Sequence, residues 1–173
     1  MFSVQKSPLP DAALLAAYAR GGSYTDCYAT DVPAVVSFET YVTSFYTTAV
    51  FRTERLILKW ALARPSTDAD ACALAAGTAD RFAAWDVEAR ADDQMLLRDL
   101  RGRTRSWLMV APIGSSSAPV TRLYFGSAVV PRSGSPEGLG FPYSTLLGFH
   151  KLYSQVLLGA AKARLKKSSS HSA

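Results

Sequence analysis

The chain has 173 residues, of which 49% are hydrophobic and 19% are charged. These proportions are typical of a folded globular protein and exclude an intrinsically disordered chain, and the length suits one domain with one core. The formal net charge is +5, but the basic residues are interspersed with acidic ones and do not alternate with aromatic residues as single-strand binding requires. We therefore expect no nucleic-acid partner.

The N-terminal residues 1–22 predict an appendage with one short helix over residues 11–18, which Gly21 and Gly22 end. The apolar stretch 12–19 is short and lacks the positive flank of a signal peptide. No stretch reaches the roughly 18 apolar residues that cross a membrane. We expect a cytoplasmic protein without membrane insertion.

Residues 23–166 predict a single domain that begins with a strand and a helix. Alternation over residues 24–32 indicates the strand, which Pro33 closes. Ser37 can cap the helix, in which large apolar residues recur at spacings of three and four. These residues are Phe38, Tyr41, Val42, Phe45 and Tyr46.

Two further helices are expected before the main group of strands. Thr47 and Thr48 indicate a break, after which a second helix continues to Pro65. Ser66 or Thr67 can cap a third short helix, because acidic residues occupy its first turn and a glycine follows its end.

The hydrophobic period then changes from that of a helix to that of a strand. Trp85, Val87 and Ala89 are expected to point to one face of a strand whose other face is exposed to water. Arg101 and Gly102 predict the turn of a hairpin, because glycine readily adopts a positive φ. The predicted strands span residues 85–90, 95–100, 104–110 and 122–130.

A long C-terminal helix is expected over residues 143–165, which contain no proline. Its apolar stripe is wide, so we expect the helix to be enclosed either by its own sheet or by another copy of the chain. The stripe consists of Leu146, Phe149, Tyr153, Val156, Leu157 and Ala160. Residues 167–173 are expected to form a disordered tail.

This order of elements resembles the START-like helix-grip superfamily, SRPBCC, which includes the polyketide cyclase, Bet v and lipid-transfer families. The likeness spans about residues 24–165 and is nearest to uncharacterised bacterial members. It is carried by Trp85, Arg101–Leu108, Thr121–Val129 and Leu147–Tyr153. It implies an α+β fold with a curved antiparallel sheet gripping the long C-terminal helix, and a space between them that holds an apolar ligand. Since only five strands are predicted, fewer than is usual there, either a strand is hidden in residues 112–120 or 131–142 or the sheet is smaller.

The resemblance implies that aromatic and sulfur-containing residues line the space between sheet and helix, where polarisable side chains adapt to apolar ligands. The alternative is a solid core, since aromatic residues at strand and helix spacing are more often packing residues. The candidate ligand-binding residues are Trp85, Met95, Trp107, Met109, Tyr124, Phe149, His150 and Tyr153.

His150 is the candidate catalytic residue, as a general base on the gripping helix, although a structural hydrogen bond to the backbone or to a tyrosine is the favoured explanation. Arg103, Arg105 and Arg122 could clamp a carboxylate or phosphate, or form cross-strand ion pairs on the exposed face. No residue pattern predicts a metal site or a cofactor.

The two cysteines, Cys27 and Cys72, have no neighbouring cysteine or histidine at metal-binding spacing. We expect both to be reduced, buried and unreactive.

Three functions follow as hypotheses. The first is binding of a small hydrophobic molecule between the sheet and the C-terminal helix. The second is a cyclase- or hydrolase-type enzyme acting on a small organic substrate in the same space, with His150 or a tyrosine as acid–base group. The third is an interaction protein whose terminal helix is buried in a homodimer.

Overall fold

The computed structural model describes residues 4–52, 66–130 and 155–165, and these residues form an α+β fold. The strands are β1 (Gln5–Lys6), β2 (Tyr24–Val32), β3 (Arg81–Phe82), β4 (Trp85–Ala91), β5 (Gln94–Asp99), β6 (Thr104–Pro112) and β7 (Thr121–Val129). They form one seven-stranded sheet in the order β1-β2-β7-β6-β5-β4-β3, with antiparallel neighbours throughout. The first long strand therefore lies beside the last one.

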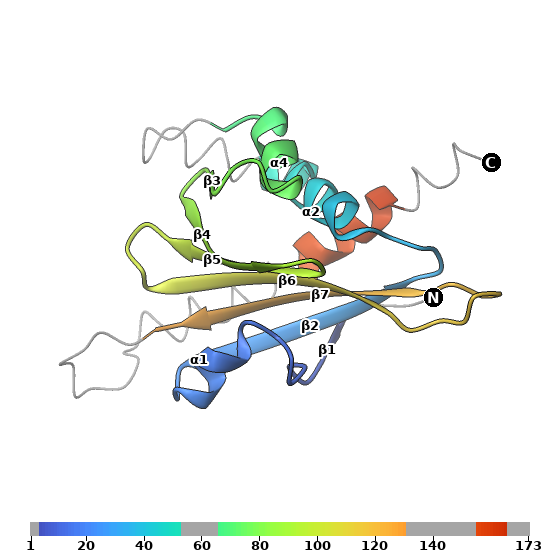
Figure 1. Ribbon diagram of the computed structural model, residues 1–173, viewed down its shortest axis with the longest axis horizontal. Coiled ribbons are helices and arrows are strands. Elements are labelled where there is room, and N and C mark those ends of the chain that lie inside the picture. Colours follow the sequence, from blue (N-terminus) through green and yellow to red (C-terminus); the bar gives the residue numbers. More distant parts are fainter. Residues whose placement is uncertain (1–3, 53–65, 131–154, 166–173) are drawn as a thin grey trace.

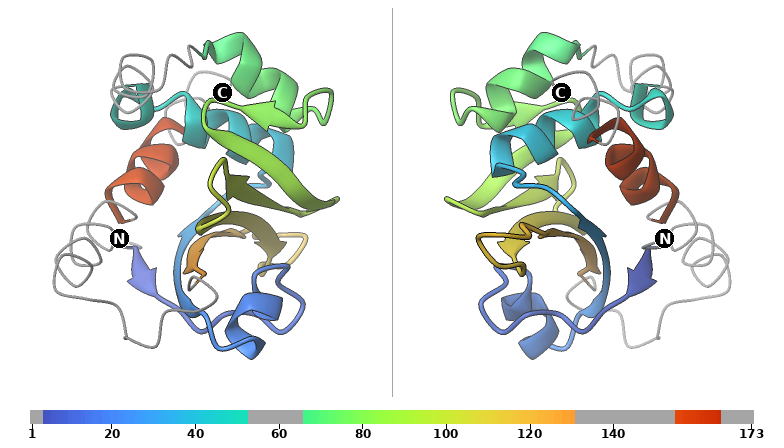
Figure 2. Two further views of the ribbon diagram at one scale, coloured as in Figure 1. Left: turned by 90° about the vertical axis from the view of Figure 1, so that its left-hand side faces the viewer. Right: turned by 90° about the vertical axis from the view of Figure 1, so that its right-hand side faces the viewer.

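Helices cover one side of this sheet, and the N-terminal segment covers the other (Figures 1 and 2). The helices are α1 (Ala16–Arg20), α2 (Phe38–Tyr46) and α4 (Asp68–Ala75), with further helical residues at 49–52 and 155–165. In Figure 1, α2, α4 and the helix of residues 155–165 lie above the sheet, whereas α1 lies below it. The sheet thus has two covered faces, the helix face and the N-terminal face.

The predicted caps form as expected. The Ser37 side chain accepts a hydrogen bond from the Thr40 amide at the start of α2. Thr67 and Asp70 form a reciprocal capping box at the start of α4, which satisfies amides that the first helical turn leaves unpaired. The hairpin between β5 and β6 turns through Gly102, whose φ is 65°, as its lack of a Cβ allows.

The sheet has more strands than the sequence predicted. The five predicted strands correspond to β2, β4, β5, β6 and β7, and the two others are the two-residue strands β1 and β3. Both are too short to show a period in the sequence. Of the two segments expected to hide a strand, residues 112–120 contain only an isolated bridge between Ser115 and Ala118, and residues 131–142 lie outside the described residues.

The prediction for β4 was wrong in one respect. Its pairing with β5 shifts register between Val87 and Ala89, because a β-bulge places one extra residue on the strand. Val87 consequently packs against the core of the helix face, whereas Ala89 packs against the core of the N-terminal face. Neither face of β4 is therefore exposed to water along its whole length.

The core of the helix face is filled with aromatic rings below α2. Phe45 contacts the ring of Phe125 on β7 at a centroid distance of 5.1 Å, and Tyr46 contacts Phe51 at 4.8 Å. The predicted apolar side of α2 is buried in full, from Phe38 to Tyr46. Such a cluster stabilises the fold by burial and by ring contacts.

The N-terminal segment is part of the packed fold. Leu15 is fully buried, and α1 begins at Ala16, later than predicted. Gly126 on β7 lies next to the side chains of Leu15 and Trp107. A Cβ at this position would come within 2.9 Å of Leu15 and 3.0 Å of Trp107. Glycine at this position thus allows the segment to approach β7 closely.

In the described part of the C-terminal helix, residues 155–165, the buried side differs from the predicted stripe, because Val156 is 45% exposed and Ala160 is only half-buried. Leu157, Leu158, Ala161 and Leu165 all belong to the core of the helix face. This packing removes the need for a second copy to cover these four residues. Residues 143–154 of the predicted helix lie outside the described residues, as does the tail from residue 167.

Candidate functional site

The sheet separates the residues predicted to bind a ligand. Trp85 and Met95 pack in the core of the helix face, whereas Trp107, Met109 and Tyr124 pack in that of the N-terminal face. The other three, Phe149, His150 and Tyr153, lie outside the described residues. The five described residues therefore do not line one common space.

On the N-terminal face, Trp107 is a fully satisfied structural residue. Its Nε1 donates a hydrogen bond of 2.9 Å to Gln94 Oε1, and its ring lies 6.0 Å from that of Tyr124. Gln94 also accepts from the amide of Leu14 and donates to the carbonyl of Ala12. These bonds fasten the N-terminal segment to β5 and β6.

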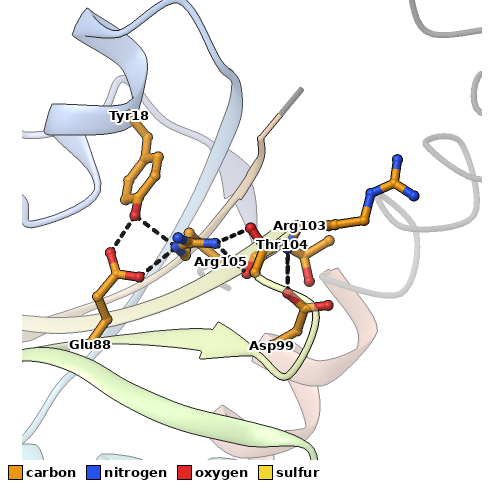
Figure 3. Close-up of polar contacts among 7 residues, drawn as sticks. Tyr18, Glu88, Asp99, Arg103, Thr104 and Arg105 are labelled. Carbon is orange, nitrogen blue, oxygen red and sulfur yellow. Dashed lines mark hydrogen bonds and ion pairs between the residues drawn. The ribbon is translucent and has the colours of Figure 1, made fainter. Parts of the chain in front are cut away.

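A second group, formed by Tyr18, Glu88 and Arg105, fastens α1 to the sheet (Figure 3). The Tyr18 hydroxyl donates to Glu88 and accepts a hydrogen bond of 2.8 Å from Arg105 Nε, which also lies 2.7 Å from Glu88 Oε2. The Arg105 guanidinium lies 4.7 Å from the centre of the Tyr18 ring. Burial and the hydrogen bond to Glu88 raise the pKa of Tyr18. Its hydroxyl stays protonated and structural.

The predicted ion pairs of the three arginines are confirmed for two of them. Arg105 is only 8% exposed, contrary to the expected exposed face, although its partner Glu88 is partly exposed. Arg122 forms a bidentate pair with Asp31 at 2.7 and 2.9 Å. Arg103 instead donates its backbone amide to Asp99 at the hairpin turn (Figure 3). Neither paired arginine is left to clamp an anion.

The helix face carries a different kind of polar group, on strand β2. Because side chains alternate along a strand, Asp26 shares a face with Tyr28, which packs in the helix-face core, while Cys27 packs on the opposite side. Asp26 is only 4% exposed. Its Oδ1 accepts hydrogen bonds of 3.1 Å from the Ser127 amide and 2.5 Å from the Ser127 hydroxyl.

The second oxygen of this carboxylate, Asp26 Oδ2, is buried and accepts no hydrogen bond from the described residues. Among these residues, Asp26 also takes part in no ion pair. A buried carboxylate oxygen without a donor is costly, so a folded protein retains one chiefly where it serves a purpose.

The groups around Asp26 respond to its charge. Burial, followed by the nearby Asp26 carboxylate, raises the pKa of Tyr24 and of Tyr28. The same two causes raise the pKa of the Cys27 thiol to about 12. All three groups therefore remain protonated at neutral pH. Cys27 is buried as predicted, whereas Cys72 is exposed, contrary to prediction, because α4 turns Ala71 and Leu74 toward the core.

The C-terminal helix adds two more polar contacts to β2. Gln155 shares a side-chain hydrogen bond with Tyr28, and Lys162 Nζ donates a bond of 2.8 Å to Thr30 Oγ1. Lys162 and Thr30 are both buried. The region between β2, β7 and this helix thus contains buried polar side chains, and we call it the β2–β7 site. It consists of the buried Asp26, Tyr28, Thr30, Ser127 and Lys162, together with the half-buried Tyr24 and the exposed Gln155.

Sequence reasoning missed this site, although a signal for it was present. Asp26 stands between Tyr24 and Tyr28 on the strand predicted over residues 24–32, so alternation placed a carboxylate among aromatic residues. Its partner Ser127 is 101 positions away, and no local pattern joins the two.

In the part of the chain that the structure describes, no three metal-binding side chains come together, and no helix there is both long and apolar enough to span a membrane. No family model matches the chain, and no curated protein matches it significantly.

Proposed function

We propose that this protein binds a small, mostly apolar molecule in the β2–β7 site, between the sheet and the C-terminal helix. The observation that carries the proposal is the contrast within the helix face. Below α2 the interior is an aromatic cluster, whereas beside the C-terminal helix it contains buried polar side chains such as Asp26, Thr30 and Lys162. An apolar surrounding with a few convergent polar groups is the usual composition of a small-molecule site.

The resemblance to START-like proteins supports the same proposal. In that superfamily a long C-terminal helix lies across a curved sheet, and an apolar ligand is held between the two. Here helices follow the first long strand, and a helix over residues 155–165 packs on the sheet. Fold alone does not determine function, so the proposal depends on the residues of the site.

Native mass spectrometry tests the proposal. The purified chain is incubated with an extract of lipids and apolar metabolites, and we expect a bound mass together with an increase in melting temperature. A bulky substitution beside Asp26, Ser127→Leu, should remove the bound mass. The matched control, Ala111→Leu, lies in the other core and should retain it. A chain that stays free of ligand, without a thermal shift, would contradict the proposal.

One observation favours an enzyme of the cyclase or hydrolase type as a second candidate. Asp26 lies between Tyr24 and Tyr28 on the same face of β2, so the site places a carboxylate acceptor beside two hydroxyl donors. The distinction lies in the fate of the ligand. A ligand recovered with altered mass after incubation supports the enzyme, and one recovered unchanged supports binding alone.

A further inference from the structure

The Asp26 carboxylate indicates which class of molecule the β2–β7 site accepts. Asp26 Oδ1 accepts a hydrogen bond of 2.5 Å from the Ser127 hydroxyl and one of 3.1 Å from the Ser127 amide. These two bonds fix the orientation of the carboxylate. The other oxygen is buried and accepts no hydrogen bond from the described residues. This geometry leaves one acceptor position available for a donor that comes from outside the described chain.

The charges around Asp26 narrow the choice of donor. The neighbouring side chains of Tyr24, Tyr28 and Cys27 are neutral. Burial is the main cause that raises the pKa of each, and the Asp26 carboxylate raises it further. Lys162, the buried cation of the site, bonds to Thr30 and acts electrostatically on Asp31. The negative charge of Asp26 is therefore not balanced by an ion pair within the described residues.

A buried carboxylate is best stabilised by a charged donor, since charge-assisted hydrogen bonds are shorter and stronger than neutral ones. A protonated amine supplies both the hydrogen bond and the missing positive charge. A ligand carboxylate in the same place would bring two like charges together and would be rejected.

Building on the proposed function, we infer that the β2–β7 site selects apolar molecules that carry a protonated amine, with Asp26 Oδ2 as the acceptor. The apolar part of the ligand packs against the side chains of the helix face. Tyr24 and Tyr28 flank the acceptor on the same strand, and their rings can contact the ammonium group.

Three probes of equal chain length test this inference: octylamine, octan-1-ol and octanoate. Their dissociation constants are measured by titration calorimetry at neutral pH, where the amine is protonated and the acid is ionised. We expect octylamine to bind the wild-type chain at least about tenfold more tightly than octanoate, which is the scale of one charge-assisted hydrogen bond.

Variants assign this preference to Asp26. Asp26→Asn should reduce the ratio of octanoate to octylamine dissociation constants to near one, and Ser127→Ala should reduce it in part, because it removes one of the bonds that orient the carboxylate. The matched control is Asp31→Asn, the same change on the same strand at a residue paired with Arg122, and it should leave the ratio unchanged. Because the ratio compares two probes on one variant, partial unfolding does not affect it.

The outcomes separate the inference from the function on which it rests. Equal binding of all three probes to the wild-type chain, or a preference that survives in Asp26→Asn, would overturn the inference and leave the apolar site standing. Failure of all three to bind up to their solubility limits would overturn both.

Discussion

The two faces of the sheet bury polar groups in opposite ways. On the N-terminal face, Gln94 serves three partners and Arg105 is paired with both Glu88 and Tyr18. On the helix face, Asp26 is fixed by Ser127 on one oxygen only. Satisfied networks rigidify a structure, whereas an unsatisfied buried charge lowers stability and is retained for another reason. The comparison indicates structural networks on the first face, and the unsatisfied carboxylate of the second is the basis of the binding proposal.

The largest effect is expected from truncating the centre of the N-terminal face. Trp107 is fully buried and bonds to Gln94, so Trp107→Ala should lower the free energy of unfolding by about 3–5 kcal/mol. Urea denaturation measures this loss. Leu100→Ala is the control, because Leu100 is 43% exposed, and it should change stability by no more than about 0.5 kcal/mol. A Trp107→Ala loss below about 1 kcal/mol would mean that this face is not a rigid core.

The same chemical change on each face should have effects of opposite sign. Glu88→Gln leaves the nearly buried Arg105 without its counter-charge and should cost about 2 kcal/mol, less than for a fully buried pair because Glu88 is partly exposed. Asp26→Asn removes a buried charge without a counter-ion and should raise the free energy of unfolding by about 1 kcal/mol. Denaturation of both variants at neutral pH gives the comparison. If Asp26→Asn were as destabilising as Glu88→Gln, Asp26 would be a structural residue.

Local signals predicted the elements of the fold well. The Ser37 cap, the buried side of α2 and the turn at Gly102 are each specified within a few residues, and each is confirmed. The position of the N-terminal segment was not predictable in this way. Gln94 bonds to it across 80 and 82 positions in the chain, and such contacts leave no periodic pattern.

The candidate site was predicted less well, and for a definite reason. Aromatic and sulfur-containing residues at strand spacing indicate burial, but the face that each one joins depends on register. Trp107 and Met95 lie on adjacent strands, yet β5 and β6 pair Leu96 with Trp107 and Met95 with Leu108. The two candidates therefore point to opposite faces, and neither composition nor alternation within one strand could show this.

The smallest effect is expected at the partly exposed pair of Arg122 and Asp31 on β7 and β2, where the contribution of charge to stability can be separated from that of packing. The hydrogen bond from Arg122 holds the pKa of Asp31 below its usual value, so the folded state favours the ionised carboxylate. The resulting stabilisation is present above the unfolded pKa of about 3.9 and is lost as the pH falls through the lower folded value. Asp31→Asn should therefore cost less than about 1 kcal/mol at neutral pH, and its difference from the wild type should disappear in acid. Denaturation measured from neutral pH down to below the folded pKa of Asp31 tests both parts, and a cost that persists unchanged in acid would show that Asp31 acts by packing rather than by its charge.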